Sequence, residues 1–240
     1  GRIGKPGCGP FSVTGQPNAM GGRETGGLAN MLAAHIDFDD VSGAESVRKF
    51  WNAPSLATKP GLKAVELFDE IANGTVKALW VMATNPAVSI SSSKQVQDAI
   101  EKCDFVVVSD IVKHTDTALG ANVLLPAAGW GEKDGTVTNS ERCISRQRQL
   151  VPFPGEVRPD WWMIAEVAKK MGYGSEFEYS GAAAIFREYA AMTGIKSDRD
   201  RALDISPLAQ ISEQAFDALH PARWPLRNLT KSNSGERLYT

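Results

Sequence analysis

Three short and continuously apolar runs constrain the fold of this chain more than any other feature. They cover residues 78–84, 105–108 and 122–125, and each is followed by polar residues or proline. Runs of this length without alternating polar positions are typical of strands that are covered on both faces, as in a parallel sheet. We therefore predict that these runs form the strands of a parallel sheet.

The segment between the first two runs carries helical periodicity. Apolar side chains recur at the spacing i, i+3, i+4 and i+7, at Val96, Ala99, Ile100 and Cys103. Ser92 or Ser93 stands in front of them as a candidate N-cap. This succession predicts a β-α-β unit. For the chain as a whole we predict an α/β fold: a Rossmann-like three-layer domain with a parallel sheet, followed by a helical C-terminal extension.

Polar residues follow the strands directly. In open parallel sheets, ligands bind in the crevice beyond the carboxyl ends of the strands, where Asn85, Ser109 and Asp110 are expected to lie. The Asp110 carboxylate can accept hydrogen bonds from ribose hydroxyls or from the donor edge of guanine, and the other two side chains can add short polar contacts. A turn or helix cap explains Asp110 equally well from spacing alone.

Three charged residues outside the strands are further candidates. Lys133 lies in a glycine-flanked loop, where a cation near the ligand edge suits a diphosphate, although most loop lysines are simply solvated. Asp160 is interpreted first as a helix cap and second as a ligand residue. Arg23 stands beside Glu24, where it could orient a planar oxyanion or form an ordinary surface salt bridge.

Differences in composition along the chain suggest a division into three segments. Nine of the 22 glycines fall within the first 27 residues, which predicts a long functional loop without helix or strand. A short helix at 28–36 and a connection to Pro60 complete a first segment, 1–60, interpreted as a glycine-rich active-site loop. Residues 61–173 form the α/β domain, which binds the ligand and opens with an amphipathic helix ending at 73–74. Residues 174–240 form a helical extension and linker.

Within these segments, the part after the third strand is expected to carry binding loops and helices. Residues 127–159 are rich in glycine, charge and turn residues, which favours a long binding segment. Helices are predicted at 160–171, at 180–193 and at about 212–219.

Charge and hydropathy exclude several classes of partner. A formal net charge of −2, from 26 basic and 28 acidic residues, gives no positive field for nucleic acid or an anionic membrane. No run approaches the roughly 18 apolar residues of a membrane span, and the first residues lack the apolar stretch of a signal peptide. We expect a soluble protein. The absence of an initiating Met and the abrupt end indicate an internal piece of a longer polypeptide.

The motifs of several enzyme classes are missing. The first strand runs into residues 85–88 instead of a G-x-G-x-x-G turn, which disfavours an ordinary nicotinamide site. There is no Walker A motif and no G-x-S-x-G elbow. Cys8, Cys103 and Cys143 lie far apart, so we expect no metal or iron–sulfur site built from this chain alone.

Seven short motifs follow one another along the first 173 residues. They occupy residues 14–24, 84–86, 107–110, 124–127, 130–135, 139–142 and 158–161. In this order they resemble the molybdopterin oxidoreductase family of bis-molybdopterin guanine dinucleotide enzymes, and within it the branch of bacterial assimilatory nitrate reductases. The sequence of residues 18–22 resembles that of the cytoplasmic nitrate reductases more than that of the periplasmic ones.

The resemblance implies that the chain is an α/β part of a larger molybdenum nitrate reductase. Such an enzyme reduces nitrate to nitrite by oxygen-atom transfer at molybdenum, and the protein supplies binding, orientation and electrostatics. Contacts to one guanine dinucleotide are implied for Asn85, Ser109, Asp110, Lys133 and Asp160. Arg23 would face the substrate near the metal.

The resemblance also implies partners and departures. The partners are the remaining domains of the parent chain, nitrate, and an electron donor such as ferredoxin, flavodoxin or an NADH-dependent reductase. The parent would hold a 4Fe–4S cluster, but neither the cluster ligands nor the molybdenum-ligating cysteine has a counterpart here. The isolated piece is therefore expected to be inactive.

Two alternatives remain open. A formate dehydrogenase alpha subunit belongs to the same family, although Thr14 stands where those enzymes tend to carry arginine. A scaffold domain of the large iron–sulfur subunit of respiratory NADH dehydrogenase has a similar fold without pterin. Polar strand ends at Asn85, Ser109 and Asp110, with the cation at Lys133, disfavour the scaffold, which has no need of them.

Overall fold

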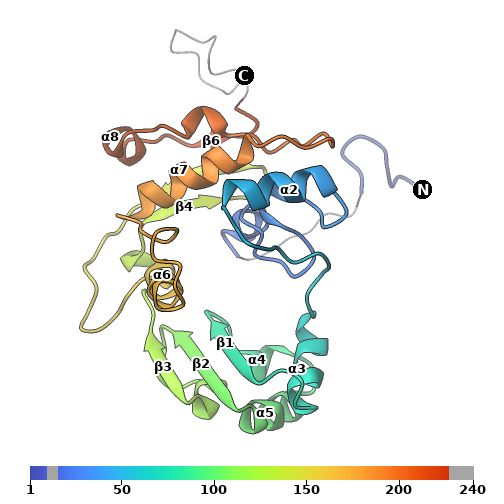
Figure 1. Cartoon of the computed structure of the whole chain (residues 1–240), viewed down its shortest axis with the longest axis vertical. Helices are drawn as coiled ribbons and strands as arrows, with labels where there is room; N and C mark the ends of the chain where they lie inside the picture. Colours follow the sequence, from blue (N-terminus) through green and yellow to red (C-terminus); the bar gives the residue numbers. More distant parts are fainter. Residues whose placement is uncertain (10–15, 227–240) are drawn as a thin grey trace.

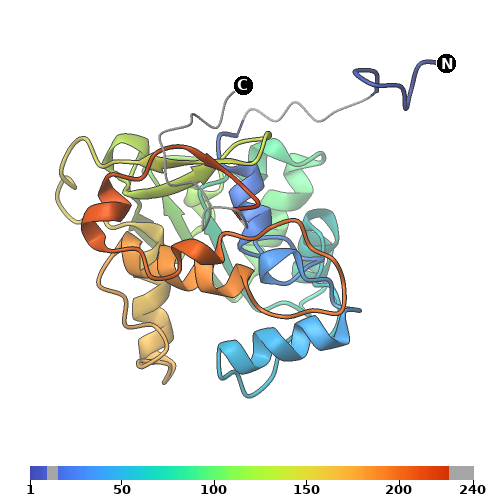
Figure 2. The same cartoon turned by 90° about the horizontal axis from the view of Figure 1, so that it is seen from above.

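The computed structural model of the chain describes residues 1–9 and 16–226. Thr14 and Gly15 of the first motif, and the predicted linker beyond residue 226, therefore lie outside the described residues. A parallel sheet with its covering helices forms one end of the molecule, and an antiparallel sheet with further helices forms the other (Figure 1). Seen from above, residues 1–9 extend away from the rest of the molecule (Figure 2).

The parallel sheet consists of β1 (Ala78–Met82), β2 (Phe105–Asp110) and β3 (Val123–Pro126), in the order β1-β2-β3. All neighbouring strands are parallel. The predicted sheet is confirmed. The first strand is shorter than its apolar run because Ala83, at φ +53°, turns the chain away from the sheet.

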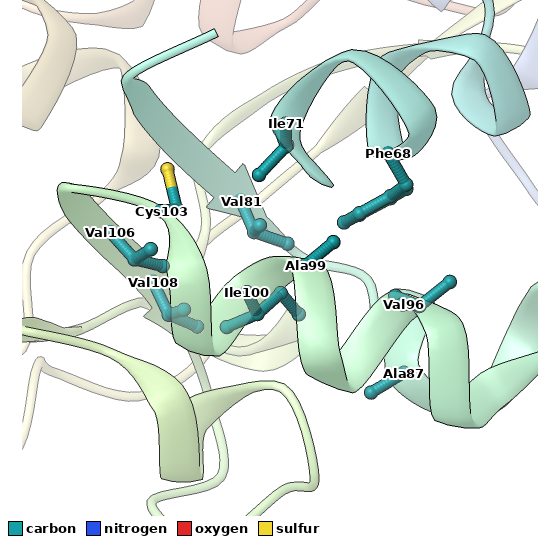
Figure 3. Close-up of a cluster of buried hydrophobic side chains, with 10 residues drawn as sticks. All are labelled: Phe68, Ile71, Val81, Ala87, Val96, Ala99, Ile100, Cys103, Val106 and Val108. Carbon is teal, nitrogen blue, oxygen red and sulfur yellow. The ribbon is translucent and has the colours of Figure 1, made fainter. Parts of the chain in front are cut away.

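Helices cover the sheet on both faces. α3 (Ala64–Ala72), α4 (Pro86–Ser89) and α5 (Ser93–Lys102) pack on one face. The buried core there consists of Phe68, Ile71, Val81, Ala87, Val96, Ala99, Ile100, Cys103, Val106 and Val108 (Figure 3). On the opposite face, Ser109 contacts Met163 of α6 (Asp160–Lys170). The predicted three-layer α/β arrangement is confirmed, as is the helix expected after Ser92.

The first 60 residues contain more helix than predicted. α1 (Ala19–Glu24) lies in the segment expected to be a loop, and α2 (Val41–Phe50) lies in the expected connection. Both expectations are wrong. The Asp40 side chain caps α2 by accepting a hydrogen bond from the Gly43 amide at 2.9 Å. α1 contains two glycines, so its propensity is poor, and tertiary contacts stabilise it instead.

The helix predicted at 28–36 is also wrong. Only the 3₁₀ turn η1 (Ala33–His35) forms there, and Ala34 and His35 have φ values of +58° and +57°. Left-handed backbone at two consecutive residues cannot continue an α-helix. The segment therefore turns back toward α1 instead of extending.

An antiparallel sheet contains the middle of the segment that was expected to be a long binding segment. It contains β4 (Gly135–Thr138), β5 (Cys143–Gln147) and, from the C-terminal part, β6 (Ala222–Arg223). The Asn139 side chain closes the β4–β5 turn by accepting hydrogen bonds from the amides of Glu141 and Cys143, each at 3.0 Å. Strand pairing therefore orders the middle of residues 127–159, where no strand was predicted.

The C-terminal helices lie where they were predicted. α7 (Ala182–Thr193) and α8 (Glu213–Asp217) are joined by the 3₁₀ turn η4 (Ser206–Leu208), and two more 3₁₀ turns, η2 (Ala118–Gly120) and η3 (Trp130–Glu132), flank β3. A second buried core joins these helices to the antiparallel sheet. Its members are Ile144, Ala183, Phe186, Ala190, Leu203, Ile205, Phe216, Trp224 and Leu226. The domain division at residues 60 and 173 stays a prediction.

Gly26, which follows α1, cannot be replaced by another residue without strain. Its φ is +80°, and a Cβ added there would lie 2.7 Å from the backbone nitrogen of Ala33. We expect Gly26→Ala to lower the free energy of unfolding by about 1–3 kcal/mol, because the strained φ and the backbone contact act together. Gly22→Ala, with nothing within 4 Å of its added Cβ, is the matched control. Equal urea midpoints for the two variants would contradict the prediction.

Candidate functional site

A cleft of about 390 Å³ lies beyond the carboxyl ends of the three parallel strands, and we call it the strand-end cleft. Each strand contributes the residues that follow it: 83–85 after β1, 110–112 after β2 and 127–129 after β3. Thr115, Trp130 and Lys133 complete its lining. Three of the predicted site residues, Asn85, Asp110 and Lys133, therefore share one cleft.

Asn85 stands at the start of α4, where the chain leaves β1. Its Oδ1 accepts hydrogen bonds from the backbone amide and the hydroxyl of Thr117, at 3.2 and 2.7 Å. The Thr117 hydroxyl oxygen in turn accepts a hydrogen bond from the Ala87 amide. This fixes the orientation of the Asn85 amide. Its NH₂ group makes no hydrogen bond within the described residues and is available to an acceptor in the cleft.

Asp110 lies at the end of β2 and closes a short turn. Its Oδ1 accepts a hydrogen bond from the Val112 amide at 3.1 Å. The turn role considered from sequence is therefore real, but it occupies only one carboxylate oxygen. The other oxygen has no partner among residues 1–9 and 16–226, so Asp110 can serve the turn and a ligand together.

Lys133 and Asp160 form an ion pair at the edge of the strand-end cleft. Lys133 Nζ lies 2.7 Å from Asp160 Oδ2, and the two side chains are only 30% and 28% exposed. They meet because Arg158 pairs with Ala127 in a parallel bridge, which places the start of α6 beside the loop after β3. The expected helix cap at Asp160 is wrong: Pro159 occupies the N-cap position, and the Asp160 carboxylate bonds Lys133 instead.

One oxygen of this pair lacks a partner. Asp160 Oδ1 is buried and accepts no hydrogen bond in the part of the chain that the structure describes. An unsatisfied buried carboxylate oxygen costs about 1–3 kcal/mol, so this oxygen has the capacity to accept one further hydrogen bond.

Ser109 is not brought into the cleft. It is 1% exposed, and its hydroxyl accepts a hydrogen bond from Trp80 Nε1 at 2.7 Å and approaches Met163 Sδ at 3.6 Å. Successive side chains along β2 point to opposite faces, so Ser109 faces α6 while its neighbour Asp110 lies at the rim of the sheet. Its observed contacts join β1, β2 and α6.

Arg23 lines a second, larger cleft of about 780 Å³, which we call the Arg23 cleft. Its walls come mainly from residues 16–28, with Trp130 and Ser140 from the rest of the chain. Arg23 is exposed on α1 and forms no hydrogen bond or ion pair within the described residues. The surface salt bridge to Glu24 considered from sequence is therefore absent there, and the guanidinium is available to an anion.

Glu24 points away from Arg23 and is buried, with 1% of its surface exposed. Its Oε2 accepts hydrogen bonds from the hydroxyls of Thr138 and Tyr189, at 2.8 and 2.5 Å, and its Oε1 from Trp224 Nε1 at 2.6 Å. Burial, and then the Glu24 charge, raise the pKa of Tyr189, which keeps its hydroxyl a donor. Sequence reasoning missed Glu24 because a glutamate in a glycine-rich segment is normally exposed.

His35 lies near this carboxylate and packs edge-on against Trp224, with ring centroids 5.8 Å apart. Burial lowers the pKa of His35, although the nearby Glu24 charge opposes the shift. His35 is therefore neutral near pH 7. It supports the wall behind α1 and adds no positive charge to the Arg23 cleft.

The described residues hold no group of three or more His, Cys, Asp or Glu side chains arranged for a metal ion. Among the same residues, no helix is both long enough and apolar enough to cross a membrane. The chemistry of the site thus consists of a carboxylate, an amide and an ion pair in one cleft, and an arginine in another.

These features define the class of the chain: an α/β domain whose parallel strands end at a polar crevice, the place where such sheets bind their ligands. A family model described as "Molybdopterin oxidoreductase" matches residues 1–170, and the chain belongs to this family. Membership implies a molybdopterin cofactor carrying molybdenum, as the resemblance of the motifs predicted.

Several known proteins are similar to the chain. A protein named nitrate reductase from Klebsiella oxytoca is 54% identical over 228 residues, which cover 94% of this chain and 26% of that protein. The F420-dependent formate dehydrogenase subunit alpha of Methanocaldococcus jannaschii is 39% identical over 193 residues, covering 80% of this chain and 28% of that protein. The chain thus spans about a quarter of the length of these relatives.

A solved structure shows the same fold. Acetylene hydratase from Pelobacter acetylenicus superposes with a TM-score of 0.54 at 18% sequence identity. The match covers 78% of this chain and 24% of the other. At this identity the likeness establishes the arrangement of helices and strands, and nothing about the reaction.

Proposed function

We propose that this chain is part of a molybdenum nitrate reductase and that it binds one molybdopterin guanine dinucleotide. The observation that carries the proposal is the strand-end cleft. It combines the free carboxylate oxygen of Asp110, the free amide of Asn85 and the Lys133 ammonium, whose ion-pair partner Asp160 lies at the edge of the cleft. The 54% identity to a protein named nitrate reductase favours nitrate as the substrate.

Each side chain has a role that its contacts support. Asp110 and Asp160 accept hydrogen bonds from the guanine edge or the ribose, and the Asn85 NH₂ donates one to an acceptor oxygen. Lys133 supplies a cation for the diphosphate while it remains paired with Asp160. Ser109 has a supporting role, because its hydroxyl already bonds Trp80. When bound, the molybdenum centre supplies the oxygen-atom transfer that converts nitrate to nitrite.

Arg23 is proposed as the residue that orients nitrate. A planar guanidinium matches a planar oxyanion through parallel N–H donors, and Arg23 is exposed in the larger cleft without a competing carboxylate. Burial of Glu24 keeps its negative charge on the other side of α1. Nitrate would therefore contact the Arg23 guanidinium without meeting the negative charge of Glu24, which is buried behind α1.

The rest of the enzyme is proposed from the family resemblance. It would supply the molybdenum ligand, the second pterin dinucleotide site and a 4Fe–4S cluster. Its electrons would come from a donor such as ferredoxin, flavodoxin or an NADH-dependent reductase. We propose that the enzyme acts in nitrate assimilation in the cytoplasm, in keeping with the sequence of residues 18–22.

Formate dehydrogenase is the second candidate, since a formate dehydrogenase subunit is 39% identical over 80% of this chain. Assay of the full-length enzyme with nitrate and with formate separates the two. Nitrite production from nitrate supports the first function. Dye reduction by formate without nitrate reduction would establish the second.

Arg23→Ala in the full-length enzyme tests the substrate role. We expect kcat/KM for nitrate to fall by about 10- to 100-fold, in line with the loss of one charged hydrogen-bonding group, while molybdenum content stays unchanged. Arg2→Ala, which removes an arginine from the exposed N-terminal stretch, is the control. Unchanged nitrate kinetics in Arg23→Ala would remove this residue from the site.

A further inference from the structure

We propose that Trp130 is a cofactor-binding residue: its indole face stacks on a heterocyclic ring of the pterin dinucleotide where the strand-end cleft meets the Arg23 cleft. The inference deepens the proposed function and rests on it. It concerns a residue that the strand-end argument did not identify, because Trp130 follows neither a strand nor a glycine-rich phosphate loop.

Position is the first observation. Trp130 lines both the strand-end cleft and the Arg23 cleft, and among the described residues it is the one lining residue that the two have in common. A ligand with its nucleotide in the first cleft and its other end toward Arg23 must therefore pass this side chain.

The backbone that carries Trp130 is fixed. Trp130 opens the turn η3, where the Gly129 amide donates to Glu132 Oε2 at 2.7 Å. Gln147 Nε2 donates to the Trp130 carbonyl oxygen at 2.9 Å, and the Leu150 amide donates to the Gly131 carbonyl oxygen at 2.8 Å. The turn is thus held by the Glu132 side chain and by the strand region behind it, which fixes the backbone position from which the indole projects.

The indole ring of Trp130, in contrast to this backbone, has no bonding partner among the described residues. Trp130 is 56% exposed, and its ring makes no aromatic, cation–π or hydrogen-bonding contact within residues 1–9 and 16–226. The indole N–H groups of Trp51, Trp80 and Trp224 all donate to partners. A large aromatic surface on a rigid turn between two clefts is the arrangement that proteins use to stack planar heterocycles.

The size of the effect follows from stacking. Removing an aromatic platform weakens the binding of a stacked base by about 5- to 150-fold. Phenylalanine keeps a π-face on the same turn, whereas leucine keeps apolar bulk without one. The three variants Trp130→Phe, Trp130→Leu and Trp130→Ala therefore separate stacking from simple packing.

The experiment uses the full-length enzyme. Molybdenum and guanine are quantified per protein after dialysis, and tryptophan fluorescence is recorded before and after cofactor release. We expect Trp130→Phe to stay within about twofold of wild type, and Trp130→Ala and Trp130→Leu each to retain at least about fivefold less cofactor. Release should raise wild-type fluorescence more than that of Trp130→Phe. Trp162→Phe, at an exposed tryptophan stacked on Arg158, is the control.

Three results would overturn the proposal. Full retention by Trp130→Ala removes the contact, and equal retention by the Leu and Phe variants removes stacking. The melting midpoint is also compared between wild type and Trp130→Ala, with and without cofactor. If the substitution lowers the midpoint equally in both states, Trp130 packs against the rest of the polypeptide and does not contact the cofactor. A wild-type enzyme without pterin would instead refute the proposed function itself, which keeps the two failures distinct.

Discussion

Replacing Glu24 by alanine is expected to lower the free energy of unfolding by about 3–5 kcal/mol. Three donors, from Thr138, Tyr189 and Trp224, bond the buried carboxylate and would all lose their acceptor. A hydrogen bond to a charged group contributes about 1.5–3 kcal/mol, and the three are not additive because they share one carboxylate. The measurement is the urea or thermal midpoint of the full-length protein.

Two further variants sharpen the test of Glu24. Glu24→Gln keeps the shape and one carbonyl acceptor, so we expect a smaller loss, about 1–2 kcal/mol. Glu45→Ala removes a glutamate of similar chemistry whose partner Arg48 lies on the exposed face of α2, and its midpoint should hardly change. If Glu24→Ala shifts the midpoint no further than Glu45→Ala does, the buried network does not stabilise α1.

Lys133→Met is expected to reduce cofactor retention by about 10- to 100-fold. The substitution removes the cation proposed to face the diphosphate, and a charged hydrogen bond of this kind contributes about 1.5–3 kcal/mol. It also leaves Asp160 half-buried without its partner at 2.7 Å. Molybdenum and guanine content per protein is the measurement.

Controls separate binding from stability at Lys133. Lys94→Met removes an exposed lysine that is paired with Asp98 on α5 and does not line the cleft, and this variant should retain cofactor fully. The double variant Lys133→Met with Asp160→Leu replaces the ion pair by two uncharged side chains, so folding should recover, while cofactor retention should not because both proposed contacts are lost. Recovery of cofactor in the double variant would show that Lys133 acts through stability alone.

The parallel half of the fold was predictable because its signals are local. Each of the strands β1, β2 and β3 is a continuous apolar run, and α5 repeats its buried residues at helical spacing. The antiparallel half was missed for two reasons: β4 and β5 are short strands of mixed polarity, and β5 pairs with β6 across the whole C-terminal segment. Short strands that mix polar and apolar residues show no regular hydrophobic alternation, so their sequences cannot be distinguished from those of loops.

The site was predictable to the same extent. Asn85 and Asp110 follow strands directly, so the rule for parallel sheets brought them to one cleft. Ser109 could have been excluded by the period of two along β2, since its neighbour was already placed at the rim. The Lys133–Asp160 pair depends on the bridge between Ala127 and Arg158, which no motif encodes.

The partners of Glu24 have a consequence for the order of events during synthesis. Trp224, which donates to Oε1, lies 200 residues further along the chain. At a ribosomal rate of about 5–20 residues per second, α1 leaves the ribosome roughly 10–40 s before that partner has been made. The wall that carries Arg23 is therefore completed only after residue 224 has been made, and until then the Glu24 carboxylate on α1 lacks one of its three donors.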